Sequence, residues 1–133
     1  MDTLNAIMID DEFKRMNEKG FDKWLDMAYS VYEIVSFANS LRDDLTVIFT
    51  IHSQTERDDS GYCFTRAKTS GKKLEKIVIE SKFTTVILAK CDGGEYFFEL
   101  KNNNSTVKTP LGAFEEDKIE NDILKVIEAL KNY

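Results

Sequence analysis

An amphipathic stretch lies between two short apolar runs in the first half of the chain. Within Asp22–Leu41, apolar residues recur in steps of three and four, as they do on one face of a helix. These residues are Trp24, Ala28, Val31, Val35 and Ala38. Leu4–Ile9 and Leu45–Ile51 have the length of buried strands, and the second is rich in β-branched residues. Strand, helix and strand in this order predict a βαβ unit with parallel strands and a right-handed connection.

The second half of the chain predicts a β-hairpin followed by a terminal helix. Phe83–Ala89 and Tyr96–Leu100 have the composition of strands, and an Asp-Gly-Gly turn lies between them. Asn121–Lys131 has apolar residues at helical spacing. Between the two halves, the polar segment Gln54–Gly61 predicts a mobile loop, and Tyr62–Thr65 predicts a short strand.

The size and composition of the chain suit one folded domain. It has 133 residues, of which 42% are hydrophobic and 11% aromatic. That apolar content is sufficient for one compact core, so we expect residues 1–133 to form a single α/β domain. Cys63 and Cys91 lack the CxxC spacing and lie in predicted strands, so we expect buried free thiols in a reducing compartment. With one histidine they are too few for a zinc site of ordinary spacing.

Charge and hydropathy narrow the possible partners. The formal net charge is -6, and an acidic surface repels phosphate backbones, so nucleic-acid binding by the isolated chain starts at a disadvantage. The lysines Lys72, Lys73 and Lys76 could still touch nucleic acid, although a solvated charged face explains them more simply. No apolar run approaches the roughly 20 residues of a membrane span. The acidic N-terminal segment has no basic region of a signal peptide, so we expect a cytoplasmic protein without membrane contact.

Acidic side chains follow the first predicted strand directly. The run Leu4–Ile9 ends at Asp10 and Asp11, which gives it the form of a Walker B segment. Carboxylates at the carboxyl end of a buried strand lie in the crevice where open α/β sheets bind ligands. There, Asp10 could hold a magnesium ion indirectly, through a bound water. His52 follows the next predicted strand and would lie on the same rim. The competing interpretation is that the acids cap a turn and that His52 is a structural hydrogen-bonding residue.

Four segments occur in an order that resembles a known family. They are Ile9–Asp11, Asn17–Trp24, Leu41–Leu45 and Asn104–Glu115. Together they resemble the C-terminal half, from Walker B onward, of the small RecA-like ATPases carried by phages of Gram-positive bacteria. The resemblance implies a partial RecA-like mixed sheet, a link to single-strand annealing and phage DNA recombination, and the cytoplasm of a bacterial host. It also implies that Asp10, Asp11 and His52 are the remains of a nucleotide and magnesium site.

The chain departs from that family at the phosphate-binding loop. No segment fits GxxxxGK[ST]: the only Gly-Lys pair, Gly71-Lys72, is followed by Lys73, and Arg66 stands where the first glycine should be. We therefore do not expect the isolated chain to hydrolyse ATP. ATP and magnesium would bind only if a partner chain supplied the loop. Lys73 and Lys108 are candidates for basic residues that act on a neighbouring subunit's nucleotide; the simpler alternative is that they are solvated.

Without the strand that carries the phosphate-binding loop, a RecA-like sheet would expose the edge of Leu4–Ile9. An apolar edge strand promotes aggregation unless it is covered, so we expect a partner chain, a homo-oligomer or a rearranged topology. Two functions follow. The chain is either an ATPase fragment that acts through a partner in phage DNA recombination, or an acidic protein-binding module that inhibits or regulates a host defence or nucleic-acid protein. The acidic runs Asp10–Glu12 and Glu115–Asp117 suit the second function.

Overall fold

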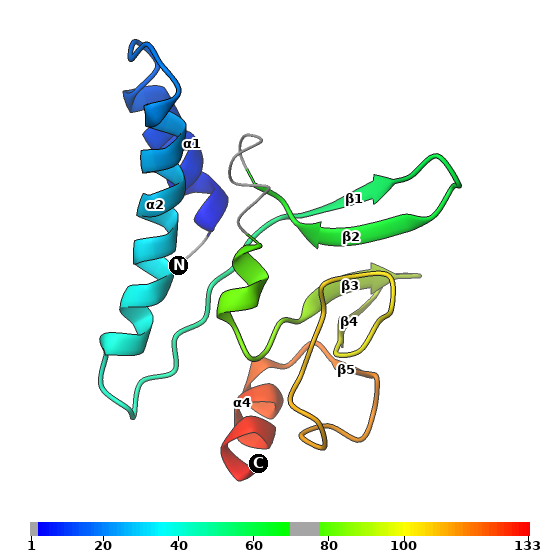
Figure 1. The fold of residues 1–133 in the computed structure, drawn as a ribbon. Helices are drawn as coiled ribbons and strands as arrows, with labels where there is room; N and C mark the ends of the chain where they lie inside the picture. The colour runs from blue at the N-terminus through cyan, green and yellow to red at the C-terminus, as the bar shows by residue number, and fades with distance from the viewer. Residues whose placement is uncertain (1–2, 70–77) are drawn as a thin grey trace. The chain divides into compact units, whose positions relative to one another are not determined.

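The computed structural model of the protein describes residues 3–69 and 78–133, and the structure is mixed α/β, as predicted. Its contacts divide the chain into two compact units. The helical unit comprises Met1–Gln54 and Ala67–Lys82, and the sheet unit comprises Thr55–Arg66 and Phe83–Tyr133. Figure 1 shows the elements of both units. Within the described residues, no helix is both long and apolar enough to cross a membrane.

Two antiparallel helices dominate the helical unit. α1 (Leu4–Lys14) and α2 (Asp22–Phe37) lie side by side and are joined by a short turn (Figure 1). A 3-10 turn, η1 (Ala38–Ser40), extends α2, and a second one, η2 (Ile79–Lys82), contacts it. The helix predicted at Asp22–Leu41 is therefore confirmed, with its α-helical part ending at Phe37. The buried apolar residues of this unit, each at most 4% exposed, are Leu4, Met8, Met27, Ala28, Val31, Val35 and Ile79.

The predicted first strand is wrong, because Leu4–Ile9 forms the first turns of α1. Thr3 caps this helix, and its side-chain hydroxyl accepts a hydrogen bond from the Ala6 N–H at 3.4 Å. Leu4 and Met8 are both 1% exposed, and their spacing of four places them on one helical face. A short apolar run fits a buried strand and a buried helical turn equally well. Here the cap and the burial of every fourth residue select the helix.

The predicted second strand is absent as well, and with it the βαβ unit and its parallel pair. Residues 45–51 form no strand. Their backbone instead helps to hold the start of α1, because the Thr50 carbonyl accepts a hydrogen bond from the Leu4 N–H at 2.9 Å. The edge strand that the sequence predicted at Leu4–Ile9 therefore does not exist, and Leu4 and Met8 are covered within the helical unit itself.

A buried asparagine ties α1 to the two chain segments beside it. Asn5 is only 6% exposed. Its Oδ1 accepts a hydrogen bond from the His52 N–H at 2.7 Å, and its Nδ2 donates to the Lys68 carbonyl at 2.9 Å. The Lys68 N–H donates in turn to the His52 carbonyl at 2.6 Å. We call Asn5, His52 and Lys68 the clasp. It satisfies both ends of a buried amide, which would otherwise be costly to desolvate.

A second buried polar residue supports the same region. Glu80 in η2 is 6% exposed, and its Oε1 accepts a hydrogen bond from the Ala67 N–H at 2.7 Å. Ala67, the last residue of β2, directly precedes Lys68 of the clasp. The side chains of Glu80 and Asn5 thus form hydrogen bonds with the backbone of the adjacent residues Ala67 and Lys68. This fits the rule that buried polar groups are paired.

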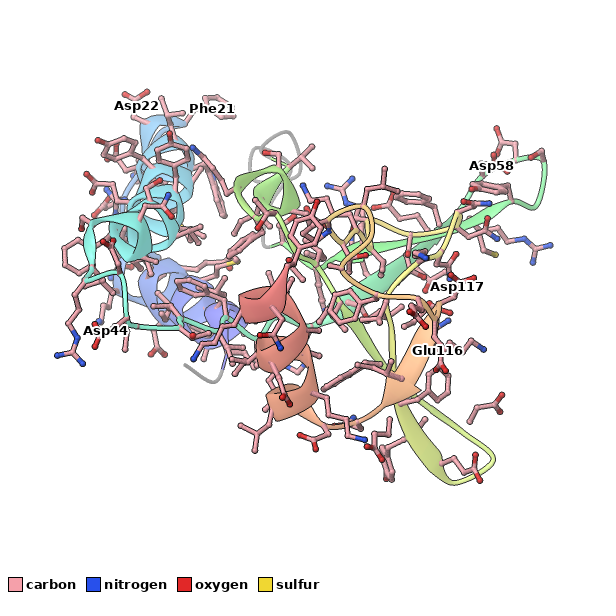
Figure 2. All side chains as sticks on the ribbon, turned by 90° about the horizontal axis from the view of Figure 1, so that it is seen from below. Phe21, Asp22, Asp44, Asp58, Glu116 and Asp117 are labelled. Carbon is pink, nitrogen blue, oxygen red and sulfur yellow. The ribbon has the colours of Figure 1, made fainter. Side chains whose placement is uncertain are left out.

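The strands β1 (Ser53–Arg57) and β2 (Cys63–Ala67) form a two-stranded hairpin. The loop predicted from Gln54 onward is therefore partly strand, whereas the predicted short strand is confirmed as β2. Asp58 stands at the tip of the hairpin (Figure 2). Its Oδ1 accepts hydrogen bonds from the hydroxyl and the N–H of Ser60 and from the Tyr62 N–H. These bonds, led by that of the Ser60 hydroxyl, lower the pKa of Asp58.

The sheet unit contains an antiparallel sheet and the last helix. Its strands β3 (Leu88–Asp92), β4 (Glu95–Glu99) and β5 (Lys118–Glu120) are arranged in the order β3-β4-β5. The predicted hairpin and terminal helix are thus confirmed as β3–β4 and α4 (Ile123–Asn132). The first strand lies later than predicted, since β3 begins at Leu88 and not at Phe83. The two turn glycines have φ of 58° and 87°, values that favour glycine in a two-residue hairpin turn. The buried centre of this unit consists of Leu100, Phe114 and Val126.

Glu99 is a buried carboxylate on β4. Its side chain is 8% exposed, and it forms an ion pair with Lys90 Nζ at 3.0 Å on the neighbouring strand. Asn102 Nδ2 donates a further hydrogen bond to it at 2.8 Å. Burial acts to raise the pKa of Glu99, but the hydrogen bonds from Asn102 and Lys90 and the nearby lysine charges lower it by more. The net pKa therefore lies below the usual range for glutamate.

This lowered pKa predicts a pH dependence of stability. A carboxylate with a depressed folded-state pKa stabilises the fold above its unfolded-state pKa, and the stabilisation is lost as pH falls through the folded-state value. We expect Glu99→Gln to lower the free energy of unfolding at pH 7 by about 1 kcal/mol. The difference from wild type should begin to shrink near the unfolded-state pKa of about 4.3 and disappear as pH falls through the lower folded-state pKa. Chemical denaturation between pH 7 and pH 3 measures both, with Glu95→Gln, an exposed glutamate on the same strand, as the control. A difference that stays constant across this range would contradict the role given to the charge.

Candidate functional site

The structure places Asp10 and Asp11 in a groove between the two helices of the helical unit. The groove has a volume of about 320 Å³. Its lining residues are Ile7, Met8, Asp10, Asp11 and Lys14 from α1 and Met27, Ser30 and Val31 from α2. The two predicted carboxylates are thus brought to one site. They lie on a helix, however, and not at the carboxyl end of a strand.

The chemistry of this groove differs from that of a Walker B crevice. Successive residues on a helix point about 100° apart, so the carboxylates of Asp10 and Asp11 diverge from one another. In residues 3–69 and 78–133, no three His, Cys, Asp or Glu side chains gather closely enough to hold a metal ion. Lys14 supplies one positive charge beside the two acids. The metal role of Asp10 stays a prediction, and the strand on which it was based does not form.

His52 belongs to the clasp through its backbone. Its N–H and carbonyl bond to Asn5 and Lys68, while its side chain is exposed. It does not follow a strand, because residues 45–51 form none. The rim that was expected to bring His52 beside the two aspartates is therefore missing. What the structure supports at this position is the alternative, a structural hydrogen-bonding residue, although its backbone and not its imidazole makes the bonds.

Of the remaining predicted residues, the structure describes Lys108 and the two cysteines. Lys73 lies outside the described residues. Lys108, in the sheet unit, pairs through its backbone with Val86, with N–O distances of 2.8 and 3.0 Å, and its side chain is exposed. Both cysteines, Cys63 and Cys91, are exposed, so their predicted burial is wrong. Each lies on a strand of a small sheet, where every second side chain can face solvent.

A second feature of the helical unit, which the sequence interpretation missed, is a set of exposed apolar and aromatic side chains. On α1 and in the turn after it, Ile9, Phe13 and Met16 are 46%, 68% and 67% exposed. On α2, Leu25, Tyr29 and Tyr32 are 58%, 57% and 38% exposed. Each group repeats at steps of four and three, so each forms a stripe along its side of the hairpin. We call these six residues the hairpin face.

The two stripes lie on the same side of the helix pair. Ile7 and Ser30 each stand one position before a buried residue, Met8 or Val31, and both line the groove. In an antiparallel pair, positions offset in the same sense from the buried seam of each helix turn to the same side. Ile9 and Tyr32 stand one position after those buried residues. The hairpin face therefore lies on the side of the pair opposite the groove.

Polar contacts hold the helix pair in shape. Arg15, after the end of α1, makes ion pairs with Glu18 at 3.0 Å and Asp26 at 2.9 Å. It also donates to the Lys23 carbonyl at 3.3 Å, so one guanidinium bridges the turn and the first part of α2. Figure 2 shows this end of α2 with Phe21 and Asp22. Arg15 thus links the end of α1 to the turn and to the start of α2, and so fixes the spacing of the two stripes.

The aromatic end of the hairpin face is ordered by a lysine. Tyr29 and Tyr32 stack with ring centroids 6.3 Å apart. Lys82 Nζ lies 3.9 Å from the centre of the Tyr32 ring and donates to its hydroxyl at 2.7 Å. That hydrogen bond lowers the pKa of Tyr32, whereas a hydrogen bond with Glu33 raises the pKa of Tyr29. These contacts hold the two rings in one arrangement while both residues remain exposed.

The sequence did contain a signal for the hairpin face. Leu25, Tyr29 and Tyr32 each come one position after a residue of the predicted helical stripe, namely Trp24, Ala28 and Val31. Two adjacent stripes are wider than a single helix packing against one neighbour requires. Comparisons with protein-family profiles, with curated proteins and with solved structures gave no match to this chain. Function is therefore inferred from the chemistry of these two surfaces.

The groove generates a prediction about nucleotides. Two diverging carboxylates repel a triphosphate, and Lys14 offsets only part of that charge. We expect calorimetric titration of the purified chain with ATP and magnesium to give no binding heat, with the same result for Asp10→Ala. Binding at micromolar strength that is lost in Asp10→Ala would contradict this expectation and show that a working nucleotide site survives.

Proposed function

We propose that this chain acts by binding another protein through the hairpin face, and that it has no catalytic activity of its own. The observation that carries the proposal is the pair of exposed stripes on one side of a fastened helix pair. Large apolar side chains scattered singly on a surface need no explanation, but six that share one face mark an interaction site. Tyrosine, phenylalanine and methionine are also enriched at protein interfaces.

The division of apolar residues between the core and the surface of the helical unit supports this function. The interior of the unit is already supplied by Leu4, Met8 and the buried stripe of α2. The exposed stripes are therefore not needed to close that core. Keeping Phe13 at 68% and Leu25 at 58% exposure gives no stability to the isolated unit. Both side chains would become buried on contact with a partner.

The resemblance to phage RecA-like ATPases supports a narrower form of the same proposal. In that form the chain is a fragment or remnant of such an ATPase, and its partner is the chain that supplies the phosphate-binding loop during DNA recombination. This form rests on the resemblance, because Asp10 and Asp11 line a groove between helices and do not follow a strand. In the other form the chain regulates a host defence or nucleic-acid protein. Phage origin and a bacterial cytoplasmic location rest on the resemblance alone.

Site-specific photo-cross-linking tests the proposal. A photoreactive phenylalanine derivative is placed at Leu25 on the hairpin face or, as a control, at Leu111, which is 92% exposed in the sheet unit. In bacterial cells that produce the chain, we expect a discrete adduct of higher mass with the probe at position 25 and none at position 111. The adduct should disappear when Phe13→Ser is added, because that substitution removes part of the same face.

Two results would contradict the proposal. One is the absence of any adduct at position 25. The other is the same diffuse set of adducts at both positions, which is what nonspecific contact by any exposed leucine produces.

A further inference from the structure

We infer that the partner segment bound by the hairpin face is a basic amphipathic helix. This inference rests on the proposed function and adds the chemistry of the partner. The hairpin face consists of two rows of apolar side chains. One row comes from α1 and the turn after it, the other comes from α2, and the line between the rows can receive the side chains of a partner. A third helix can pack there, because its own apolar residues, at spacings of three and four, interdigitate with the two rows.

The charges beside the hairpin face determine the sign of the partner. Glu12 is one helical turn from Ile9, Asp22 is one turn from Leu25, and Glu33 is one turn from Tyr29. All three acids are exposed. Residues 4–37 contain seven acidic and four basic side chains, so the helix pair as a whole carries negative charge.

Apart from Lys19, which is exposed in the turn between the two helices, the basic residues of the helix pair are directed elsewhere or already engaged. Lys14 lines the groove on the opposite side. Lys23 lies 5.0 Å from the centre of the Trp24 ring. Arg15 is paired with Glu18 and Asp26. Lys82, at the end of the face, is bonded to the Tyr32 hydroxyl. Among the described residues near the face, the exposed acids Glu12, Asp22 and Glu33 therefore outnumber the two lysines, Lys19 and Lys82.

The acids beside the hairpin face disfavour two other kinds of partner, a second copy of the chain and a nucleic acid. A second copy of the chain would bring the same acids against Glu12, Asp22 and Glu33, and like charges across an interface are unfavourable. A nucleic acid would meet acids and apolar side chains where it needs basic ones. A helix with leucines on one side and lysines or arginines beside them would pack its leucines against the apolar rows and pair its cations with the acids.

The test is an NMR titration with designed peptides. The first peptide is an amphipathic helix with leucines at steps of three and four, flanked by lysine and arginine. The second has the same leucines flanked by glutamate, and the third is a scramble of the first. We expect only the first to bind, with amide shifts concentrated in α1 and α2. Its affinity should fall at high ionic strength, because the acids that attract it are exposed and screened by salt.

Variants locate the binding to the hairpin face. We expect Leu25→Glu to weaken binding of the basic peptide by at least about tenfold. Leu111→Glu, at a leucine of the sheet unit that is even more exposed, should leave binding unchanged. Circular dichroism of each variant confirms that the helices remain. If the basic and glutamate peptides bind alike, or if Leu25→Glu has no effect, the inference is overturned.

Two further outcomes separate this inference from the proposed function. If no peptide binds but the position-25 adduct persists in cells, the helix inference fails and the protein-binding function stands. If sedimentation shows a dimer that Leu25→Glu dissociates, the occupant is a second copy and the inference is again overturned.

Discussion

One buried amide determines how the first part of this chain is arranged. Asn5 cannot be removed from water without partners for both ends of its side chain, and it finds them on the backbone of His52 and Lys68. These residues are far apart in sequence, so the bonds join the start of α1 to the segments on either side of the β1–β2 hairpin. The hydrogen bond from the Leu4 N–H to the Thr50 carbonyl joins the start of α1 to the same segment before the hairpin. The helix is thus anchored at its first turn.

The two surfaces of the helix pair follow from that anchor. With Asn5 turned inward, Met8 one turn later is buried against α2. Its neighbours Ile7 and Ile9 must then turn to opposite sides of the pair. One side becomes the acidic groove with Asp10 and Asp11, and the other becomes the hairpin face. The surface that we propose binds a partner and the groove that we expect to repel phosphate are therefore both consequences of one helical register. The proposed binding role does not need the nucleotide chemistry that the acids first suggested.

Periodicity and turn chemistry were enough to predict α2, the β3–β4 hairpin and α4. Each has a long pattern or a glycine turn that fits only one structure. The start of the chain could not be predicted in this way. A six-residue apolar run does not distinguish a strand from a helix, and the deciding contacts of Asn5 are with residues more than forty positions away. The hairpin face was missed for a related reason, because exposed apolar residues one position out of phase with the core resemble an extension of it.

The most direct measurement is an NMR assignment of residues 3–16 and of the His52 amide. We expect helical chemical shifts from Leu4 to Lys14 and slow hydrogen exchange at the His52 N–H, since Asn5 Oδ1 accepts from it. In Asn5→Ala that protection should be lost while the shifts of the sheet unit stay unchanged. Strand-like shifts over Leu4–Ile9 would contradict the helical register. They would restore a strand ending at Asp10 and remove the basis of the hairpin face.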